Sequence, residues 1–343
     1  MKKVFLGLLV IASFAACKST ETKPTETVEA SSEKVEHLYK PTYTDNFKIG
    51  DQTNVLLAEQ FHKLIFGKPS FDYIIDDKSA PNVIQEIGRL REITFRASGG
   101  GTGESVDLDE YDHGPFAYKQ LIVWSPEDEE IIGGYRFVKC RDVIDSKGEI
   151  HLSTIHYFDF TPTFISTFLP HTIELGRSWV QPDYQPTVNP RKGLFALDNI
   201  WDGLGAIVRF NPEIKYFFGK VTMYPNYNTD SRDFLLHFMH KYFPDQDKLM
   251  HPFFPLKQNY NRVYVEQQLE GLDFKDGFRV LNGHVRDHGE FIPPLVNIYM
   301  NLSPSMKTFG TAVNPEFGNV EETGILITIS DIYPEKKERH IDF

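Results

Sequence analysis

Segments with the apolar pattern of strands alternate with segments patterned as helices, and this alternation limits the fold more than any other feature of the chain. The predicted strands are Tyr118–Trp124, Ile131–Cys140, His171–Val180, Tyr216–Tyr224 and Ile325–Ile332. The predicted helices are Lys48–Phe66, Pro81–Ala97, Leu194–Val208, Asp230–Phe243 and Ile292–Leu302. Helices interleaved with strands favour an α/β or α+β domain built on a sheet.

Composition excludes several other classes of protein. Of the 343 residues, 41% are hydrophobic and 24% are charged, which suits a packed core and not a mainly disordered or coiled-coil chain. The 48 acidic residues outnumber the 36 basic ones, and the net charge of −12 argues against a nucleic-acid partner. Two cysteines, Cys17 and Cys140, are too few for a disulfide scaffold, and we expect Cys140 to be a buried thiol.

The N-terminal segment has the pattern of a lipoprotein signal. Two lysines precede the apolar run Val4–Ala16, which is about as long as a signal peptide and too short to span a bilayer comfortably. Small residues lead up to Cys17, where a lipoprotein signal peptidase would cleave and an acyl anchor would be attached. The alternative is an uncleaved N-terminal helix or a misassigned start codon. The chain is thus divided into a signal peptide, a disordered polar tether and a folded domain: residues 1–17, 18–45 and 46–343.

Four carboxylates follow a glycine-rich stretch within one short loop: Asp107, Asp109, Glu110 and Asp112. Carboxylates this close in sequence are able to hold an ammonium group or a metal ion, or to raise one another's pKa. The alternative is a solvated loop whose charges bind nothing. Pairs of histidines at helical spacing occur later in the chain, but no third ligand is obvious, and no metal site is predicted.

Charged residues also lie inside two apolar strands. Arg136 follows the paired glycines Gly133 and Gly134, which indicate a bulge or the close approach of a ligand. In the run Glu174-Leu175-Gly176-Arg177, strand alternation places Glu174 and Arg177 on opposite faces. Ionisable groups in such strands need partners, so we expect either a buried salt bridge or a cleft.

A basic loop, Arg191-Lys192-Gly193, opens the helix predicted from Leu194. Free backbone N–H groups and the helix dipole favour an anion at such a position, which makes the loop a candidate phosphate site. An ordinary helix start is the alternative.

Taken in order, five motifs resemble the ornithine-lipid and glycine-lipid N-acyltransferases. These are GNAT-fold acyltransferases, some labelled "hemolysin", and they share their skeleton with the acyl-homoserine-lactone synthases. The motifs are Arg89–Arg96, Gly101–Gly103, Asp107–Asp112, Ile132–Arg136 and Glu174–Arg177. A later stretch from Ile292 to Ile327 is similar to the C-terminal part of the lipid-forming branch, which the lactone synthases lack. The resemblance implies a GNAT-like acyl-CoA N-acyltransferase fold, with a central mixed sheet flanked by helices.

The resemblance also implies a function. A long-chain fatty acyl group, in some cases 3-hydroxylated, passes from a thioester to the amine of an amino acid or amino-acid lipid, in the synthesis of amino-acid-containing membrane lipids. The implied co-substrate and partner is acyl-CoA or acyl carrier protein, and no bound cofactor is expected. The alternatives are a lipid-anchored envelope protein that keeps the fold without turnover, and a synthase of acyl-lactone signals.

Roles for individual residues follow from the same resemblance. Glu174 accepts the amine proton, directly or through water, while Arg177 and Arg136 pair with carboxylates. The implied substrate-binding residues are Asp109, Asp112, Arg91 and Arg96. The implied donor-phosphate residues are Arg191, Lys192 and Gly193. Four phenylalanines line an acyl channel, or else belong to the core or to a membrane-facing loop: Phe158, Phe160, Phe164 and Phe168.

The expected location is the membrane. With acylation at Cys17, the protein is a lipoprotein of the cell envelope. Without it, the domain is expected on the cytoplasmic face of the inner membrane.

Overall fold

The computed structural model of the protein describes residues 63–65, 68–125, 128, 130–185, 188 and 190–342. The predicted signal peptide, the tether and Cys17 lie outside these residues, as does most of the predicted helix Lys48–Phe66. The described end of that helix is a strand instead, because β1 (Lys63–Ile65) pairs with β2 (Lys68–Ile75). The helix prediction is wrong there because a short apolar run fits either structure.

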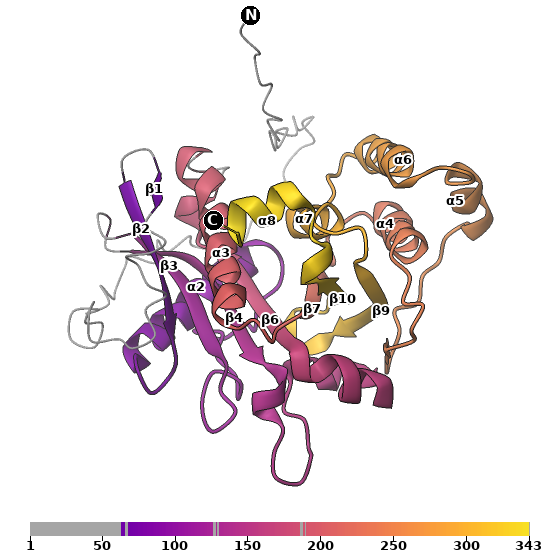
Figure 1. Cartoon of the computed structure of the whole chain (residues 1–343). Coiled ribbons are helices and arrows are strands. Elements are labelled where there is room, and N and C mark those ends of the chain that lie inside the picture. Colours follow the sequence, from indigo (N-terminus) through magenta and orange to yellow (C-terminus); the bar gives the residue numbers. More distant parts are fainter. Residues whose placement is uncertain are drawn as a thin grey trace, which may run out of the picture.

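An eight-stranded sheet forms the centre of the described fold (Figure 1). In spatial order its strands are β1, β2, β3 (Lys119–Ser125), β4 (Glu130–Lys139), β6 (Thr172–Val180), β7 (Tyr216–Met223), β10 (Val320–Thr328) and β9 (Lys307–Asn314). Neighbouring strands are antiparallel, except that β6 and β7 are parallel. The predicted mixed sheet is therefore confirmed. A second, two-stranded sheet pairs β5 (Phe158–Phe160) with β8 (Met250–Pro252).

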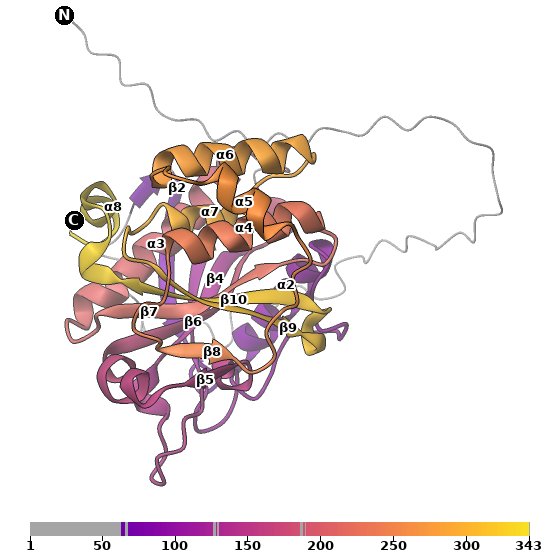
Figure 2. The ribbon, with the colours of Figure 1, turned by 90° about the vertical axis from the view of Figure 1, so that its right-hand side faces the viewer.

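Helices flank both faces of the large sheet, which we call the α2 face and the α3 face. On β3, Trp124 packs in the core beneath α2 (Pro81–Ala97), whereas Val123 packs in the core beneath α3 (Pro190–Phe210). The other helices are α4 (Thr229–Tyr242), α5 (Arg262–Gln268), α6 (Phe274–Asp287), α7 (Pro294–Met300) and α8 (Pro334–His340). Figure 2 shows α4 and α6 on the side of the sheet away from β5 and β8. Within the part of the chain that the structure describes, no helix is long and apolar enough to cross a membrane.

Helix α2 has the bounds that the sequence predicts. Pro81 occupies its first turn, where a missing N–H costs nothing, and Ile84 and Ile87 are buried on the face toward the sheet. After Ala97 the chain turns through glycines, and Gly99 and Gly101 both have φ of 94°, a conformation that favours glycine.

Most of the other predicted elements are confirmed within a few residues, and they correspond to β3, β4, β6, β7, α3 and α4. The last predicted strand, Ile325–Ile332, is shifted, since β10 begins at Val320 and ends at Thr328. The helix predicted over Ile292–Leu302 is shorter and spans Pro294–Met300. Several further elements were not predicted, among them β2, β5, β8, β9, α5, α6 and α8.

Strands β6 and β7 separate part-way along their length. Among the described residues, they pair only where Thr172–Leu175 lies beside Tyr216–Gly219. At the last pair the backbones are so close that a Cβ on Gly219 would lie 2.5 Å from the carbonyl oxygen of Leu175. Beyond this pair both strands continue, and their facing edges make no ladder with each other. The sheet therefore opens at its centre, next to Gly176 and Lys220.

Candidate active site

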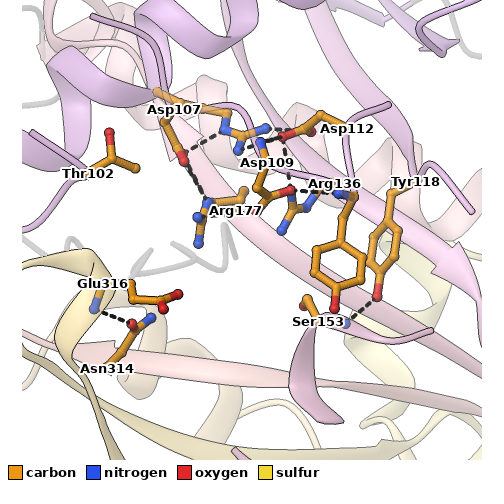
Figure 3. A network of polar contacts seen from close by, with 12 residues as sticks. Thr102, Asp107, Asp109, Asp112, Tyr118, Arg136, Ser153, Arg177, Asn314 and Glu316 are labelled. Carbon is orange, nitrogen blue, oxygen red and sulfur yellow. Dashed lines mark hydrogen bonds and ion pairs between the residues drawn. The ribbon is translucent and has the colours of Figure 1, made fainter. Parts of the chain in front are cut away.

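The predicted acidic loop binds arginines from three different elements (Figure 3). Arg91, on α2, donates from Nε to Asp107 at 2.9 Å and from Nη1 to Asp112 at 2.9 Å. All three side chains are fully buried. A buried, paired carboxylate is not a solvated loop charge, so the alternative of a solvated loop is excluded for Asp107 and Asp112.

Arg136, on β4, binds the same loop from the sheet. Its Nη1 donates to Asp109 at 2.5 Å and to Asp112 at 3.0 Å. Gln120, on β3, adds a hydrogen bond to Asp112 at 2.8 Å. Asp109 keeps 25% of its side chain exposed, in contrast to Asp112. Asp112 is thus an internal anchor, while Asp109 reaches the surface of the site.

Arg177 joins this network because β6 is irregular. Its φ of 48° lies in the left-handed region, which is uncommon for a residue other than glycine. Its Nε lies 2.9 Å from Asp107, and its guanidinium carbon lies 4.3 Å from the centre of the Phe317 ring. The prediction that Glu174 and Arg177 face opposite sides is wrong, because the irregular backbone turns Arg177 onto the α2 face.

Three arginines therefore meet three aspartates, and the arginines lower the pKa of the two buried carboxyls, Asp107 and Asp112. Burial opposes the charge of Asp112, but Arg136 and Arg91 outweigh it and hold the pKa of this carboxyl well below its usual range. The pKa of Asp107 is lowered in the same way, with burial opposed by Arg91 and Arg177. Asp107 and Asp112 therefore stay ionised around neutral pH, and their ion pairs fix the loop against the sheet.

Glu174 lies at the centre of a separate set of hydrogen bonds on the α2 face. Its side chain is fully buried. One carboxylate oxygen accepts from Tyr118 at 2.8 Å and from Ser153 at 2.5 Å, and the other accepts from Thr154 at 2.5 Å. Ser153 is partly exposed, so its hydroxyl connects the buried carboxylate with the surface of the site.

Arg96 binds a glutamate of its own helix. It donates to Glu92 rather than to the acidic loop, at 2.5 Å from Nη2. Glu92 in turn accepts from the backbone N–H groups of Thr102 and Gly103, at 2.9 and 3.0 Å. Arg96 and Glu92 thus hold the glycine loop in place, and the implied substrate-binding role of Arg96 stays a prediction.

The predicted phosphate loop lies in the first turn of α3. This helix starts at Pro190, ten residues after the end of β6, and Gly193 is buried. The side chains of Arg191 and Lys192 lie outside the described part of the structure, so their role stays a prediction.

An open space reaches the middle of the sheet at Gly176. A Cβ at this position would have no heavy atom of the described residues within 4 Å, although β6 is a central strand. Glu316, on the turn Pro315–Phe317, lies opposite Arg177 across this region (Figure 3). A glycine with a free volume above it, in the interior of a strand, is typical of a place where a ligand approaches the backbone.

A buried charge pair that sequence reasoning missed lies beside this opening. Lys220, on β7, donates to Glu322 at 2.6 Å, and its ammonium nitrogen lies 3.9 Å from the centre of the Tyr157 ring. The signal in the sequence is a lysine within the apolar strand YFFGKVTM. Like the charged residues of β6, a lysine in an apolar strand needs either a partner of opposite charge or a cleft.

The four phenylalanines suggested for an acyl channel lie mainly in the core. Phe158 and Phe164 are fully buried, and the ring of Phe164 lies 5.6 Å from that of Phe218. Phe160 is buried and Phe168 packs at the margin of the same cluster. The core alternative is therefore the one that the packing supports. Cys140 belongs to this cluster too, and the prediction of a buried thiol is confirmed.

Comparison with known proteins agrees with this geometry. Residues 90–191 match the family described as "Acetyltransferase (GNAT) domain", and these residues include Arg91, the acidic loop, Arg136 and Arg177. The chain is 52% identical over 271 residues to the glycine N(alpha)-acyltransferase of Phocaeicola vulgatus, covering 79% of this chain and 83% of that protein. The glycine N(alpha)-acyltransferase of Bacteroides thetaiotaomicron is 54% identical over 270 residues, covering 78% and 80%.

The chain belongs to the glycine N(alpha)-acyltransferase family. It is an acyltransferase with a GNAT domain, as the sequence motifs predict. Two solved acyl-homoserine lactone synthases are more distantly similar. LasI is 12% identical, with a TM-score of 0.35 and coverage of 80% of this chain and 95% of its own. BjaI is 11% identical, with a TM-score of 0.30 and coverage of 77% and 84%.

Proposed function

We propose that this N-acyltransferase transfers a long-chain fatty acyl group from a thioester to the amine of glycine. The names of the two relatives support glycine as the acceptor. We place the reaction in the free volume above Gly176, because this volume lies between the charged network and the opening of the sheet. The product would be an amide-linked acyl amino acid, a building block for membrane lipids.

The opening between β6 and β7 suits the donor. Beyond Leu175 and Gly219, the facing strand edges leave backbone N–H and C=O groups without a ladder partner in the described structure. Such edges bind extended chains that carry amide groups, by main-chain hydrogen bonds. A phosphopantetheine arm, common to CoA and acyl carrier protein, has amides of this kind. Its phosphate end would approach the start of α3, where an N-terminus favours an anion.

The charged network suits the acceptor. Glycine brings an ammonium group and a carboxylate, and both kinds of partner are present at the site. Asp109 is partly exposed beside Arg177, whose Nε lies 2.9 Å from Asp107 and whose Nη2 lies 3.5 Å from Asp109, while Glu316 lies opposite Arg177 (Figure 3). Arginine binds carboxylates through paired N–H groups, so Arg177 is positioned to hold one end of the acceptor.

The reaction forms a C–N bond and breaks a C–S bond. Glycine first loses one ammonium proton, and the resulting neutral amine attacks the thioester carbonyl carbon. Collapse of the intermediate expels the thiolate, which takes up the proton that nitrogen loses on forming the amide and leaves as the thiol. Ser153 offers a path for the ammonium proton, because this residue is partly exposed and its hydroxyl lies 2.5 Å from Glu174. In this proposal Glu174 acts through Ser153 and not by direct contact, since its side chain is fully buried.

The experiment that tests this function is an acylation assay. Purified protein is given acyl thioesters of increasing chain length, as CoA and as acyl-carrier-protein forms, with a panel of amino acids. Long-chain thioesters with glycine should release thiol and yield N-acylglycine by mass spectrometry. Turnover with acetyl-CoA while long chains stay inert would reject the long-chain donor, and another preferred amino acid would reject glycine.

The same proposal places the enzyme at a membrane, because its product carries a long acyl chain. The lipoprotein signal ending at Cys17 supports a covalent anchor in the cell envelope.

A further inference from the structure

Lys220 is placed by the strand register at the opening of the sheet. Leu175 pairs with Gly219, so Gly176 and Lys220 are the first residues of β6 and β7 beyond the shared ladder. Phe217 and Val221 pack in the core of the α3 face, and alternation therefore directs Lys220 onto the α2 face. This is the face on which the free volume above Gly176 and the charged network lie.

The ammonium group of Lys220 has donors to spare. One of its three hydrogens is donated to Glu322. On another side, the ammonium group lies over the face of the Tyr157 ring in a cation–π contact. Within the described residues, no second acceptor bonds to this ammonium group. The side chain keeps 12% of its surface accessible, so a small ligand is able to reach it.

A second cation lies nearby on the adjacent strand. Arg177 follows Gly176 directly, and it is turned onto the same face by its left-handed backbone. Burial lowers the pKa of Lys220, Glu322 opposes this shift, and the positive charge of Arg177 adds to it. The two cations on this face therefore repel each other, and an anion bound between them would remove this repulsion.

We infer that Lys220 and Arg177 together bind the carboxylate of the amino-acid acceptor in the free volume above Gly176. The inference rests on the proposed function and deepens it, because it assigns the acceptor carboxylate to a residue of β7 that no sequence motif indicated. It makes Lys220 a determinant of specificity for acceptors with a free carboxylate.

A second ion pair, formed by the neighbour of Glu322 on β10, provides a matched control for the Lys220–Glu322 pair. Glu321 and Glu322 are neighbours on β10, and alternation directs them to opposite faces. Glu321 binds Arg232 of α4 at 2.6 Å, just as Glu322 binds Lys220 at 2.6 Å. Only the Lys220 pair lies on the face of the free volume, so the two pairs separate a binding role from a structural one.

The test compares glycine with glycinamide as acceptors of a long-chain acyl thioester. Glycinamide has the same amine but no carboxylate, and the measured quantity is the ratio of kcat/KM for glycine to kcat/KM for glycinamide. In Lys220→Met this ratio should fall at least about tenfold, the factor that one moderate charge-assisted contact provides. The KM for the thioester should stay unchanged. The control variant, Arg232→Met with Glu321→Gln, should keep the wild-type ratio.

A second variant covers the case in which Lys220→Met does not fold, because it leaves Glu322 buried without its partner. Lys220→Met combined with Glu322→Gln removes both charges, and it should show the same fall in the ratio. A wild-type ratio in either folded variant would overturn the inference. This includes an equal loss of rate for both acceptors, which is what a role of Lys220 in stabilising the reacting carbonyl would produce. If the wild-type protein acylates glycinamide and other amines but not glycine, the proposed function itself fails.

Discussion

The Nε of Arg177 lies 2.9 Å from Asp107, a residue 70 positions earlier in the chain, even though a regular strand would direct this arginine to the opposite face of the sheet. The left-handed φ of Arg177 makes the contact possible. Unfavourable backbone conformations of this kind cost about 1–3 kcal/mol, and surrounding interactions have to hold them in place. Here the buried Asp107, with Arg91 on its other side, provides such an interaction.

Asp112 and Asp109 should respond differently to substitution, because only Asp112 is fully buried. Asp112→Asn removes the shared partner of two buried arginines and should destabilise the protein by about 3–5 kcal/mol. Asp109→Asn should cost about 1 kcal/mol or less, since Asp109 is partly exposed. It should act mainly on the kcat/KM for glycine, with the thioester KM unchanged. Urea unfolding and two-substrate kinetics measure both effects, and equal destabilisation by the two variants would contradict the assigned burial.

Acid should weaken the fold through the same carboxylates. The pKa of Asp112 lies below its ordinary value of 3.8, because Arg136 and Arg91 outweigh the effect of burial. A carboxyl whose pKa is lowered by folding stabilises the folded state above its unfolded pKa, and this contribution is lost as the pH falls toward the folded value. Urea midpoints should therefore fall steeply below about pH 4. The slope should be shallower for Asp112→Asn, and an unchanged slope would show that other groups control acid unfolding.

Gly176→Ala should separate activity from stability. The added methyl group meets no described atom within 4 Å, so the free energy of unfolding should change by at most about 0.5 kcal/mol. The methyl group would still occupy the volume proposed for the reacting groups, and displacement of about 1 Å costs about 100-fold in rate. Gly283→Ala is the control, because this glycine of α6 also faces open space but lies on the other side of the sheet. Full activity of Gly176→Ala would show that the reaction does not take place in the volume above Gly176.

Ser153→Ala should slow the reaction by about 10²–10⁴-fold if its hydroxyl passes the amine proton to Glu174. The loss should shrink as the pH rises, because more glycine then arrives as the free amine and needs no deprotonation before the attack. Glu174→Gln should show the same partial recovery at high pH. A pH–rate profile of each variant measures this, and a loss that does not depend on pH would indicate a purely structural role for this pair.

Cys17→Ala should leave an unprocessed or mislocalised protein that no longer incorporates labelled palmitate. The expectation follows from the signal pattern, in which this cysteine becomes the acylated N-terminus. Labelled cells expressing either form provide the comparison. Unchanged labelling would contradict the lipoprotein anchor, and the domain would then be placed on the cytoplasmic face of the inner membrane.

Local sequence was enough to predict much of the fold. Helix α2 has its predicted bounds because a proline at the first turn, a regular apolar face and a run of glycines are all local signals. The short strand β1 was misread because three or four apolar residues carry no period. The motifs that contain Arg91, Asp112, Arg136 and Arg177 were also recognisable from their order along the chain.

How those residues combine depends on contacts between distant parts of the folded chain. Alternation along β6 placed Arg177 on the wrong face, because the deviation at its backbone is held by Asp107, which is far away in sequence. Lys220 gave a weak local signal, since its partner Glu322 lies 102 positions later in the chain. The order of the amino acids sets which charges are present and which elements carry them. The separation of β6 from β7 and the pairing across the sheet decided which charges neutralise each other and which still face the open space, because burial and distance are properties of the folded chain.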